Sequence, residues 1–153
     1  MMNTLVRPCD VEHILLDVDI QDRRQLFETV GRFLSPQRQD AASAIARQLD
    51  ERETLGSTGL GQGVAIPHAR LRDLATPIAV LVRTALPIAF GAPDDKLVDL
   101  FFILLVPEQA TQEHLQRLAD AARILCERRV RDGLRTSVSI ADVHAVMRDG
   151  GQS

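Results

Sequence analysis

The run VDLFFILLV (Val98–Val106) constrains the fold more than any other stretch of the chain. Its single charged residue is Asp99, and Pro107 follows it directly. Because apolar side chains do not alternate with polar ones, both faces of this segment must be covered, which is typical of an interior strand. Segments with helical apolar spacing occur on both sides of it in the sequence. The sequence therefore predicts an α/β fold with helices packed on both faces of a β-sheet.

Apolar periodicity and capping residues divide the rest of the chain into short elements. Strands are expected at 14–20, 64–66, 77–85 and 98–106, with a short extended piece at 88–90. Helices are expected to start at a cap on Asp19 and end near 34, and to start at Ser35-Pro36 and end near 53. Further helices are expected at 109–127, capped by Thr111 with its buried face on Leu115, Leu118, Ala119, Ala122, Leu125 and Cys126, then at 130–134 and 140–148.

Length and composition limit the classes of function. The 153 residues fit one domain, here expected to span 1–153 with a core of about 5–147. A net charge of −3, without aromatic residues among the arginines near the C-terminus, gives no reason to expect a nucleic-acid partner. The four arginines Arg128, Arg129, Arg131 and Arg135 are interpreted as a solvated helix face, with an acidic partner surface as the alternative. We expect a cytoplasmic protein with no membrane insertion, since no apolar run is long enough to cross a bilayer.

The stretch GSTGLGQGVAIPHARL (Gly56–Leu71) carries the strongest functional signal. A phosphate-binding Walker loop requires Lys followed by Ser or Thr after its last glycine, and Gln62-Gly63 stand there instead. A dinucleotide loop needs GxGxxG between a strand and a helix, and the spacing here is GxGxG. The remaining interpretations are a mobile turn, or a loop whose glycines let it lie close to a docked partner.

His68 follows the strand 64–66 and Pro67. Proline offers no backbone N–H, so the strand is expected to stop there and leave His68 at the rim of the sheet. Alternation places Val64, Ile66 and His68 on one side. The plain interpretation is a rim histidine bonded to a backbone carbonyl, and the functional one is a reactive imidazole. The four histidines show no metal-ligand spacing, so no metal site is expected.

This stretch, with ERE (Glu51–Glu53) before it and VDLFFILLVP and HLQRLADAARIL after it, closely resembles enzyme IIA of the bacterial phosphotransferase system. The type is the mannitol/fructose-like IIA, type 2, and in particular its nitrogen-regulatory member. The resemblance spans roughly Leu5 to Met147. It implies the mannitol-type IIA fold, with a mixed parallel and antiparallel sheet. Ala69 is a small departure, at a position where nitrogen-regulatory members often have Gly.

The resemblance also implies roles for individual residues. His68 would accept a phosphoryl group from an HPr-like phosphocarrier, with His114 beside it and Arg52 lining the same pocket. No cofactor is needed, since the donor supplies the transfer potential. His114 could instead only cap its own helix, and Arg52 could be a solvated helix-end charge. Ser57 and Thr58 would either contact the phosphate or only shape the turn.

Three functions are compatible with these residues. The first is a phosphohistidine carrier that regulates target proteins, such as kinases or transporters, according to its phosphorylation state. The second is a sugar-transport IIA that passes the group to a IIB domain. The third is a non-catalytic regulatory binding module.

Overall fold

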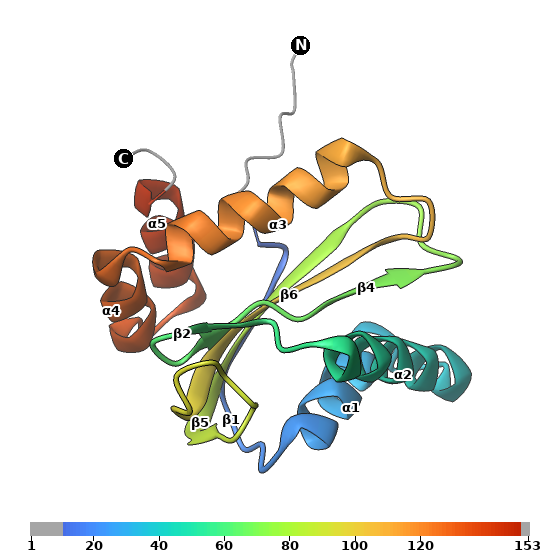
Figure 1. Cartoon of the computed structure of the whole chain (residues 1–153), viewed down its shortest axis with the longest axis horizontal. Helices are drawn as coiled ribbons and strands as arrows, with labels where there is room; N and C mark the ends of the chain where they lie inside the picture. Colours follow the sequence, from blue (N-terminus) through green and yellow to red (C-terminus); the bar gives the residue numbers. More distant parts are fainter. Residues whose placement is uncertain (1–10, 151–153) are drawn as a thin grey trace.

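The computed structural model describes residues 11–150 and has three layers, with a six-stranded sheet in the middle (Figure 1). Helices α1 (Arg23–Leu34) and α2 (Gln39–Leu55) cover one face. Helices α3 (Gln112–Leu125), α4 (Arg128–Thr136) and α5 (Ile140–Gly150) cover the other. The predicted α/β fold with helices on both faces is confirmed.

The sheet is mixed. Its order is β1 (His13–Val18), β5 (Ile78–Ile88), β6 (Val98–Pro107), β3 (Val64–Ala65) and β2 (Gly59–Gly61), and β4 (His68–Leu71) also pairs with β6. Strand β1 runs parallel to β5, and β3 and β4 run parallel to β6. The pairs β5–β6 and β2–β3 are antiparallel.

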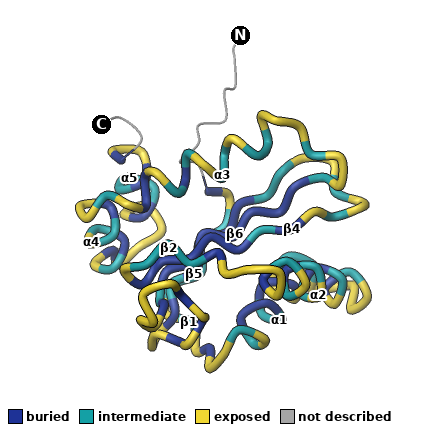
Figure 2. Tube along the Cα trace, viewed as in Figure 1, coloured by how far each residue is buried: buried dark blue, intermediate teal, exposed yellow. Residues whose placement is uncertain are grey.

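Strand β6 is the centre of the molecule, as its unbroken apolar sequence predicts. Leu100, Phe102 and Leu104 belong to the core under α3, α4 and α5, together with Ile124 and Val143. The alternate side chains belong to the core under α1 and α2; they are Phe101, Ile103 and Leu105. Figure 2 shows this strand buried along its length between the two helical layers. A strand that supplies two cores needs apolar residues at every position.

Two helix starts differ from the sequence-based prediction. The N-cap of α1 is Asp22, whose carboxylate accepts the N–H of Gln25, so Asp19 is not the cap. Ser35 is the C-cap of α1, and α2 begins only at Gln39. The two helices approach closely, because a Cβ on Gly31 would collide with the carbonyl of Ala42. Ser-Pro can open a helix, but here the N–H of Ser35 donates to the carbonyl of Gly31, so Ser35 closes α1 instead.

Strand boundaries and one helix face also differ. The piece expected at 77–85 continues to Ile88 as one strand, β5, because Ile88 also pairs with β6, and Phe90 lies outside the strand. Helix α3 buries Ala121, Ile124 and Leu125, while Ala119 and Cys126 are exposed. Its apolar residues form two neighbouring stripes, and only contact with β6 and α4 decides which one faces the core.

Candidate functional site

His68 lies on the edge of the sheet where β3 and β4 follow one another along β6. Pro67 separates the two short strands, and its carbonyl accepts the N–H of Leu104 at 3.0 Å. The strand does end before Pro67, as expected, but pairing with β6 resumes at His68, which is the first residue of the next strand. The register partner of His68 is Leu104, which belongs with Val64 and Ile66 to the core on the α3 side. His68 thus shares a side with Val64 and Ile66, as alternation predicts.

Both ring nitrogens of His68 have a partner. Nδ1 lies 3.1 Å from the carbonyl oxygen of Ile66, and Nε of Arg52 donates to Nε2 at 3.3 Å. A carbonyl only accepts and a guanidinium only donates. The proton of the neutral ring is therefore on Nδ1, and the lone pair of Nε2 faces Arg52.

The surroundings keep this imidazole neutral. Burial lowers the pKa of His68 below its usual 6.5, and the charges of Arg52 and Arg70 lower that pKa further. The hydrogen bond to Ile66 and the charge of Glu53 act in the opposite direction, but the net shift is downward. At neutral pH the ring is therefore an uncharged base with an available Nε2.

Arg52 stands in the last turn of α2, where the chain leaves the helix through the C-cap Gly56. Besides the bond to His68, its Nη1 donates to the carbonyl oxygen of Gly56 at 2.9 Å. Among residues 11–150 it forms no ion pair with a carboxylate. Its positive charge is therefore held beside Nε2 without being neutralised.

A groove of about 500 Å³ opens over this pair of residues. Arg70 of β4 and Leu115 of α3 line it together with Arg52 and His68. Leu55, the last residue of α2, also lines it and is 85% exposed. The groove thus combines two arginines and one carboxylate, Glu51, with an apolar rim.

His114 lies at the start of α3, one residue before Leu115. It occupies position N3, where the hydroxyl of Thr111 accepts its N–H and its own Nδ1 accepts the N–H of Thr111, each at 3.3 Å. The interpretation of His114 as a cap of its own helix is confirmed. Because Nδ1 accepts, the ring proton is on Nε2, which remains a donor.

Ser57 and Thr58 differ in their surroundings. Ser57 is exposed, and its hydroxyl accepts the N–H of Gly59 at 3.1 Å. Thr58 is 6% exposed, and its N–H and hydroxyl both donate to the carboxylate of Glu53 at 2.8 Å. Thr58 is therefore buried inside the protein and does not line the groove over His68. The sequence analysis missed Glu53, although its position four residues after the buried Leu49 places it on the inner face of α2.

The glycine-rich stretch forms a hairpin rather than an open loop. Gly61, Gln62 and Gly63 all have positive φ, at 87°, 59° and 79°, as the β2–β3 turn requires. A Cβ on Gly63 would collide with the guanidinium of Arg135, which donates to the carbonyl of Gln62 at 2.7 Å. The glycines thus serve contacts within the chain, and Arg135 is not part of a solvated basic face.

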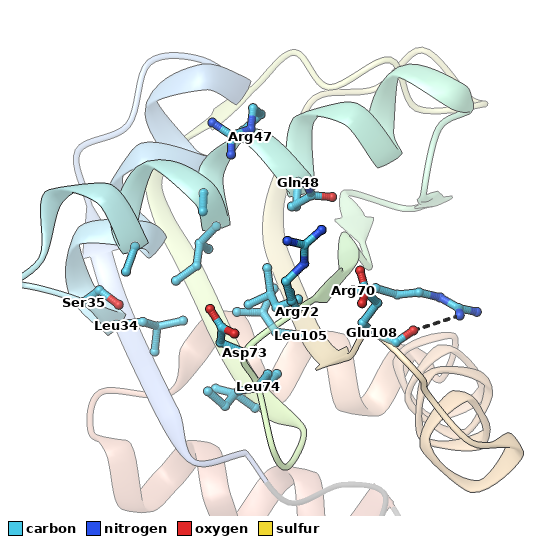
Figure 3. Close-up of a pocket in the computed structure, with 15 residues that line it drawn as sticks. Leu34, Ser35, Arg47, Gln48, Arg70, Arg72, Asp73, Leu74, Leu105 and Glu108 are labelled. Atoms are coloured by element: carbon cyan, nitrogen blue, oxygen red, sulfur yellow. Dashed lines mark hydrogen bonds between the residues drawn. The ribbon is translucent and has the colours of Figure 1, made fainter.

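A second groove, of about 540 Å³, lies between α2 and the end of β4 (Figure 3). It shares Gln48 and Arg70 with the groove over His68. Arg72 and Asp73 line it, and Arg70 is turned toward the carbonyl of Glu108 at 3.4 Å. Arg70, Arg72 and Asp73 thus continue the charged surface from the groove over His68 into this second groove.

Comparison with known proteins identifies the fold and the family. Residues 7–150 match the family described as the phosphoenolpyruvate-dependent sugar phosphotransferase system, EIIA 2. The chain belongs to this family. The nitrogen regulatory protein of Pseudomonas aeruginosa is 37% identical to this EIIA type 2 chain over 136 residues, which are 88% of each protein. A fructose-specific EIIA component from Haloferax volcanii is 37% identical over 112 residues, 73% of each.

Solved structures agree with this assignment. The nitrogen regulatory protein IIA-Ntr from Neisseria meningitidis superposes with a TM-score of 0.83 at 42% identity, covering 88% of this chain and 92% of that one. The mannitol IIA of Escherichia coli superposes with a TM-score of 0.71 at 20% identity, covering 89% and 96%. The second likeness confirms the predicted mannitol-type IIA fold. In the described part of this EIIA type 2 chain, no helix is long and apolar enough to cross a membrane.

Proposed function

We propose that the chain is a phosphohistidine carrier of a nitrogen-regulatory phosphotransferase system, with Nε2 of His68 as the phosphoryl acceptor. The observation that supports this most is the pair of contacts on the ring, with Nδ1 beside the carbonyl of Ile66 and Nε2 turned toward Arg52, from which the tautomer follows. The donor is an HPr-like phosphocarrier. The nitrogen–phosphorus bond of the donor breaks, and its electron pair stays on the donor nitrogen. The lone pair of Nε2 of His68 forms the new bond to phosphorus.

Arg52 supplies the positive charge that this transfer needs. The transition state spreads negative charge over three equatorial oxygens, which a guanidinium can contact with two N–H groups. The bond from Arg52 to Nε2 must be given up as phosphorus approaches, and the same N–H then faces a phosphoryl oxygen. His114 adds a second donor through its Nε2–H, and Ser57 offers an exposed hydroxyl two residues after the end of α2.

Regulation follows from the charge change. A phosphoryl group on His68 adds nearly two negative charges to a groove that Arg52 and Arg70 make positive, so a partner that reads this surface distinguishes the two states. Such partners include kinases or transporters, in the cytoplasm where soluble carriers act. The likeness to proteins named nitrogen regulatory proteins favours this role.

A sugar-transport role is the second candidate, favoured by the likeness to a fructose-specific EIIA component. It would use the same acceptor and hand the group to a IIB domain. Incubating the phosphorylated chain with a fructose-type IIB separates the two roles. Rapid loss of the phosphoryl group to IIB supports transport, and retention supports regulation.

The decisive experiment is intact-protein mass spectrometry after incubation with phosphoenolpyruvate, enzyme I and an HPr-like carrier, at alkaline pH. We expect one added phosphoryl group on the wild-type chain and none on His68→Ala. His144→Ala, which changes a half-buried histidine of α5, is the control and should gain the group. No mass gain with a competent carrier would contradict the proposal and favour a non-catalytic binding module.

A further inference from the structure

Glu53 is a buried acid that the proposed phosphoryl transfer does not use. Its side chain is on the inner face of α2 and the residue is only 4% exposed. Both carboxylate oxygens are bonded to one residue: Oε2 accepts the N–H of Thr58, and Oε1 accepts its hydroxyl, each at 2.8 Å. A buried carboxylate is costly unless it is well bonded, so this arrangement must hold Thr58 firmly.

Thr58 connects this carboxylate to the strand that leads to His68. Its carbonyl oxygen accepts the N–H of Ile66 at 3.0 Å. The carbonyl oxygen of Ile66 in turn lies 3.1 Å from Nδ1 of His68. Three consecutive contacts therefore lead from the end of α2 to the ring nitrogen that does not face Arg52.

The peptide between Ile66 and Pro67 depends on this connection. Pro67 has no N–H, so the nitrogen side of that peptide cannot be tied to a neighbouring strand. The orientation of the Ile66 carbonyl then depends on the bond from its own N–H to Thr58 and on the bond from Leu104 to the Pro67 carbonyl. This carbonyl decides which nitrogen of His68 carries the proton.

We propose that Glu53 and Thr58 are positioning residues that act through the Ile66 carbonyl to keep the His68 proton on Nδ1 and its lone pair on Nε2. The inference rests on the proposed function for its consequence in phosphoryl transfer, but the tautomer itself can be measured without any transfer. The neighbouring Arg52 holds the other side of the ring, so residues 52 and 53 of one helix end control both nitrogens.

The test uses the full chain and three variants. Thr58→Val keeps the shape of the side chain but removes its hydroxyl donor. Thr58→Ser restores the donor. Thr54→Val is the matched control, because Thr54 is next to Glu53 on α2 and its hydroxyl donates to the carbonyl of Asp50 at 2.8 Å on an exposed face. Nitrogen-15 NMR of the histidine rings measures the tautomer, and the rate of mass gain with the phosphorylated carrier measures transfer.

We expect the wild-type chain, Thr58→Ser and Thr54→Val to show His68 with its proton on Nδ1. Thr58→Val should show a mixture of the two tautomers and an acceptance rate lower by on the order of 10-fold, as expected for a displaced reactive group. If Thr58→Val unfolds, Glu53→Met is measured in its place, since it fills a similar volume but accepts neither the N–H nor the hydroxyl of Thr58. It should show the same mixture of tautomers, and a single wild-type tautomer in folded Glu53→Met would contradict the inference.

Two other results would also overturn the inference. One is a single wild-type tautomer and a wild-type rate in Thr58→Val. The other is a loss in Thr54→Val as large as in Thr58→Val, which would indicate a general effect on stability. A wild-type chain that accepts no phosphoryl group at all would contradict the proposed function, while the tautomer measurement would still decide the positioning role.

Discussion

Arginines lie at both ends of β6, and they are bonded in opposite ways. Near the start of β6, Arg135 is paired with Asp99 at 2.9 Å, and beside it Arg83 donates to both oxygens of Asp17. Near the end of β6, Arg52 donates to a neutral imidazole and a carbonyl. A carboxylate partner neutralises a guanidinium and makes it part of the scaffold. An arginine with only neutral partners keeps its charge for an incoming anion.

Arg83 and Arg135, near the start of β6, show how an arginine with a carboxylate partner supports the fold. The Arg83 side chain is 11% exposed, and its Nη1 also donates to the carbonyls of Leu134 and Ser137 at 3.0 and 2.6 Å. It thereby ties the end of α4 to β5. Arg135 does the same for the β2–β3 turn. Neither contact involves the groove over His68.

Removing Arg52 tests the arginine near the end of β6 and should have the largest effect on phosphoryl acceptance. Arg52→Ala should lower the rate of phosphoryl acceptance by about 100-fold or more, the usual cost of one preorganised donor at a developing charge. Its thermal midpoint should change little, because the two lost bonds lie at a helix end. The rate of mass gain and a thermal melt measure the two effects. Arg38→Ala, which removes an equally charged exposed residue at the opposite end of α2, should leave the rate unchanged.

Removing Arg83 tests an arginine near the start of β6 that has a carboxylate partner. Arg83→Met should lower the free energy of unfolding by about 2–4 kcal/mol, because buried carbonyls and one carboxylate lose their donor. Urea unfolding measures this loss, and folded Arg83→Met should still accept the phosphoryl group. Arg24→Ala removes an exposed i,i+4 pair with Glu28 and should cost at most about 0.5 kcal/mol. Equal losses in both variants would contradict the comparison.

Arg135 should have a smaller effect of the same kind. Its side chain is 31% exposed and that of Asp99 is 26% exposed, so solvent screens the pair in part. Arg135→Met should lower the free energy of unfolding by about 1 kcal/mol. Hydrogen exchange should become faster at Gln62 and Gly63 while the amides of β6 stay protected. Unchanged exchange in the turn would show that Arg135 does not hold it.

The pH dependence should give the smallest effect above pH 6.5. A lowered pKa keeps His68 neutral there, so the acceptance rate should vary by less than about 2-fold between pH 8 and 6.5 if the carrier is unaffected. The free energy of unfolding changes with pH in the same direction as the acceptance rate. The unfolded chain binds the proton first, so the contribution of His68 is complete above 6.5 and is lost as pH falls toward the lowered pKa. An NMR titration of His68 that places its pKa above 6.5 would contradict this.

The layered fold could be predicted because the evidence for it is local. An apolar run with no alternation requires cover on both sides, and the Thr111 cap that places His114 at N3 depends on residues three apart. The start of α2 could not be predicted, because Ser35-Pro36 is a good helix start in isolation. The contact between Gly31 and Ala42 joins positions that no local pattern relates.

The candidate site also has some features that the sequence shows and others that only the structure shows. His68 after a proline, with ERE upstream, is visible in the sequence, and the resemblance to the EIIA type 2 family follows from these residues. The network through Glu53, Thr58 and Ile66 is not visible, because Thr58 is an ordinary turn residue until its burial is known. The same holds for the pairing of β4 with β6, which makes His68 the first residue of a second edge strand rather than a residue beyond the last one.

The sequence by itself determined the layer architecture, the family and which residues carry reactive groups, since all three depend on residue type and short spacing. The tertiary structure alone decided which arginine keeps its charge, which histidine nitrogen carries the proton and which threonine is buried. These properties depend on how separate segments pack together, as Arg52 does against His68 and Arg135 against Asp99, and on exclusion of water. A hydrogen bond or a pKa is set by what surrounds a group, and those surroundings exist only after the layers have packed.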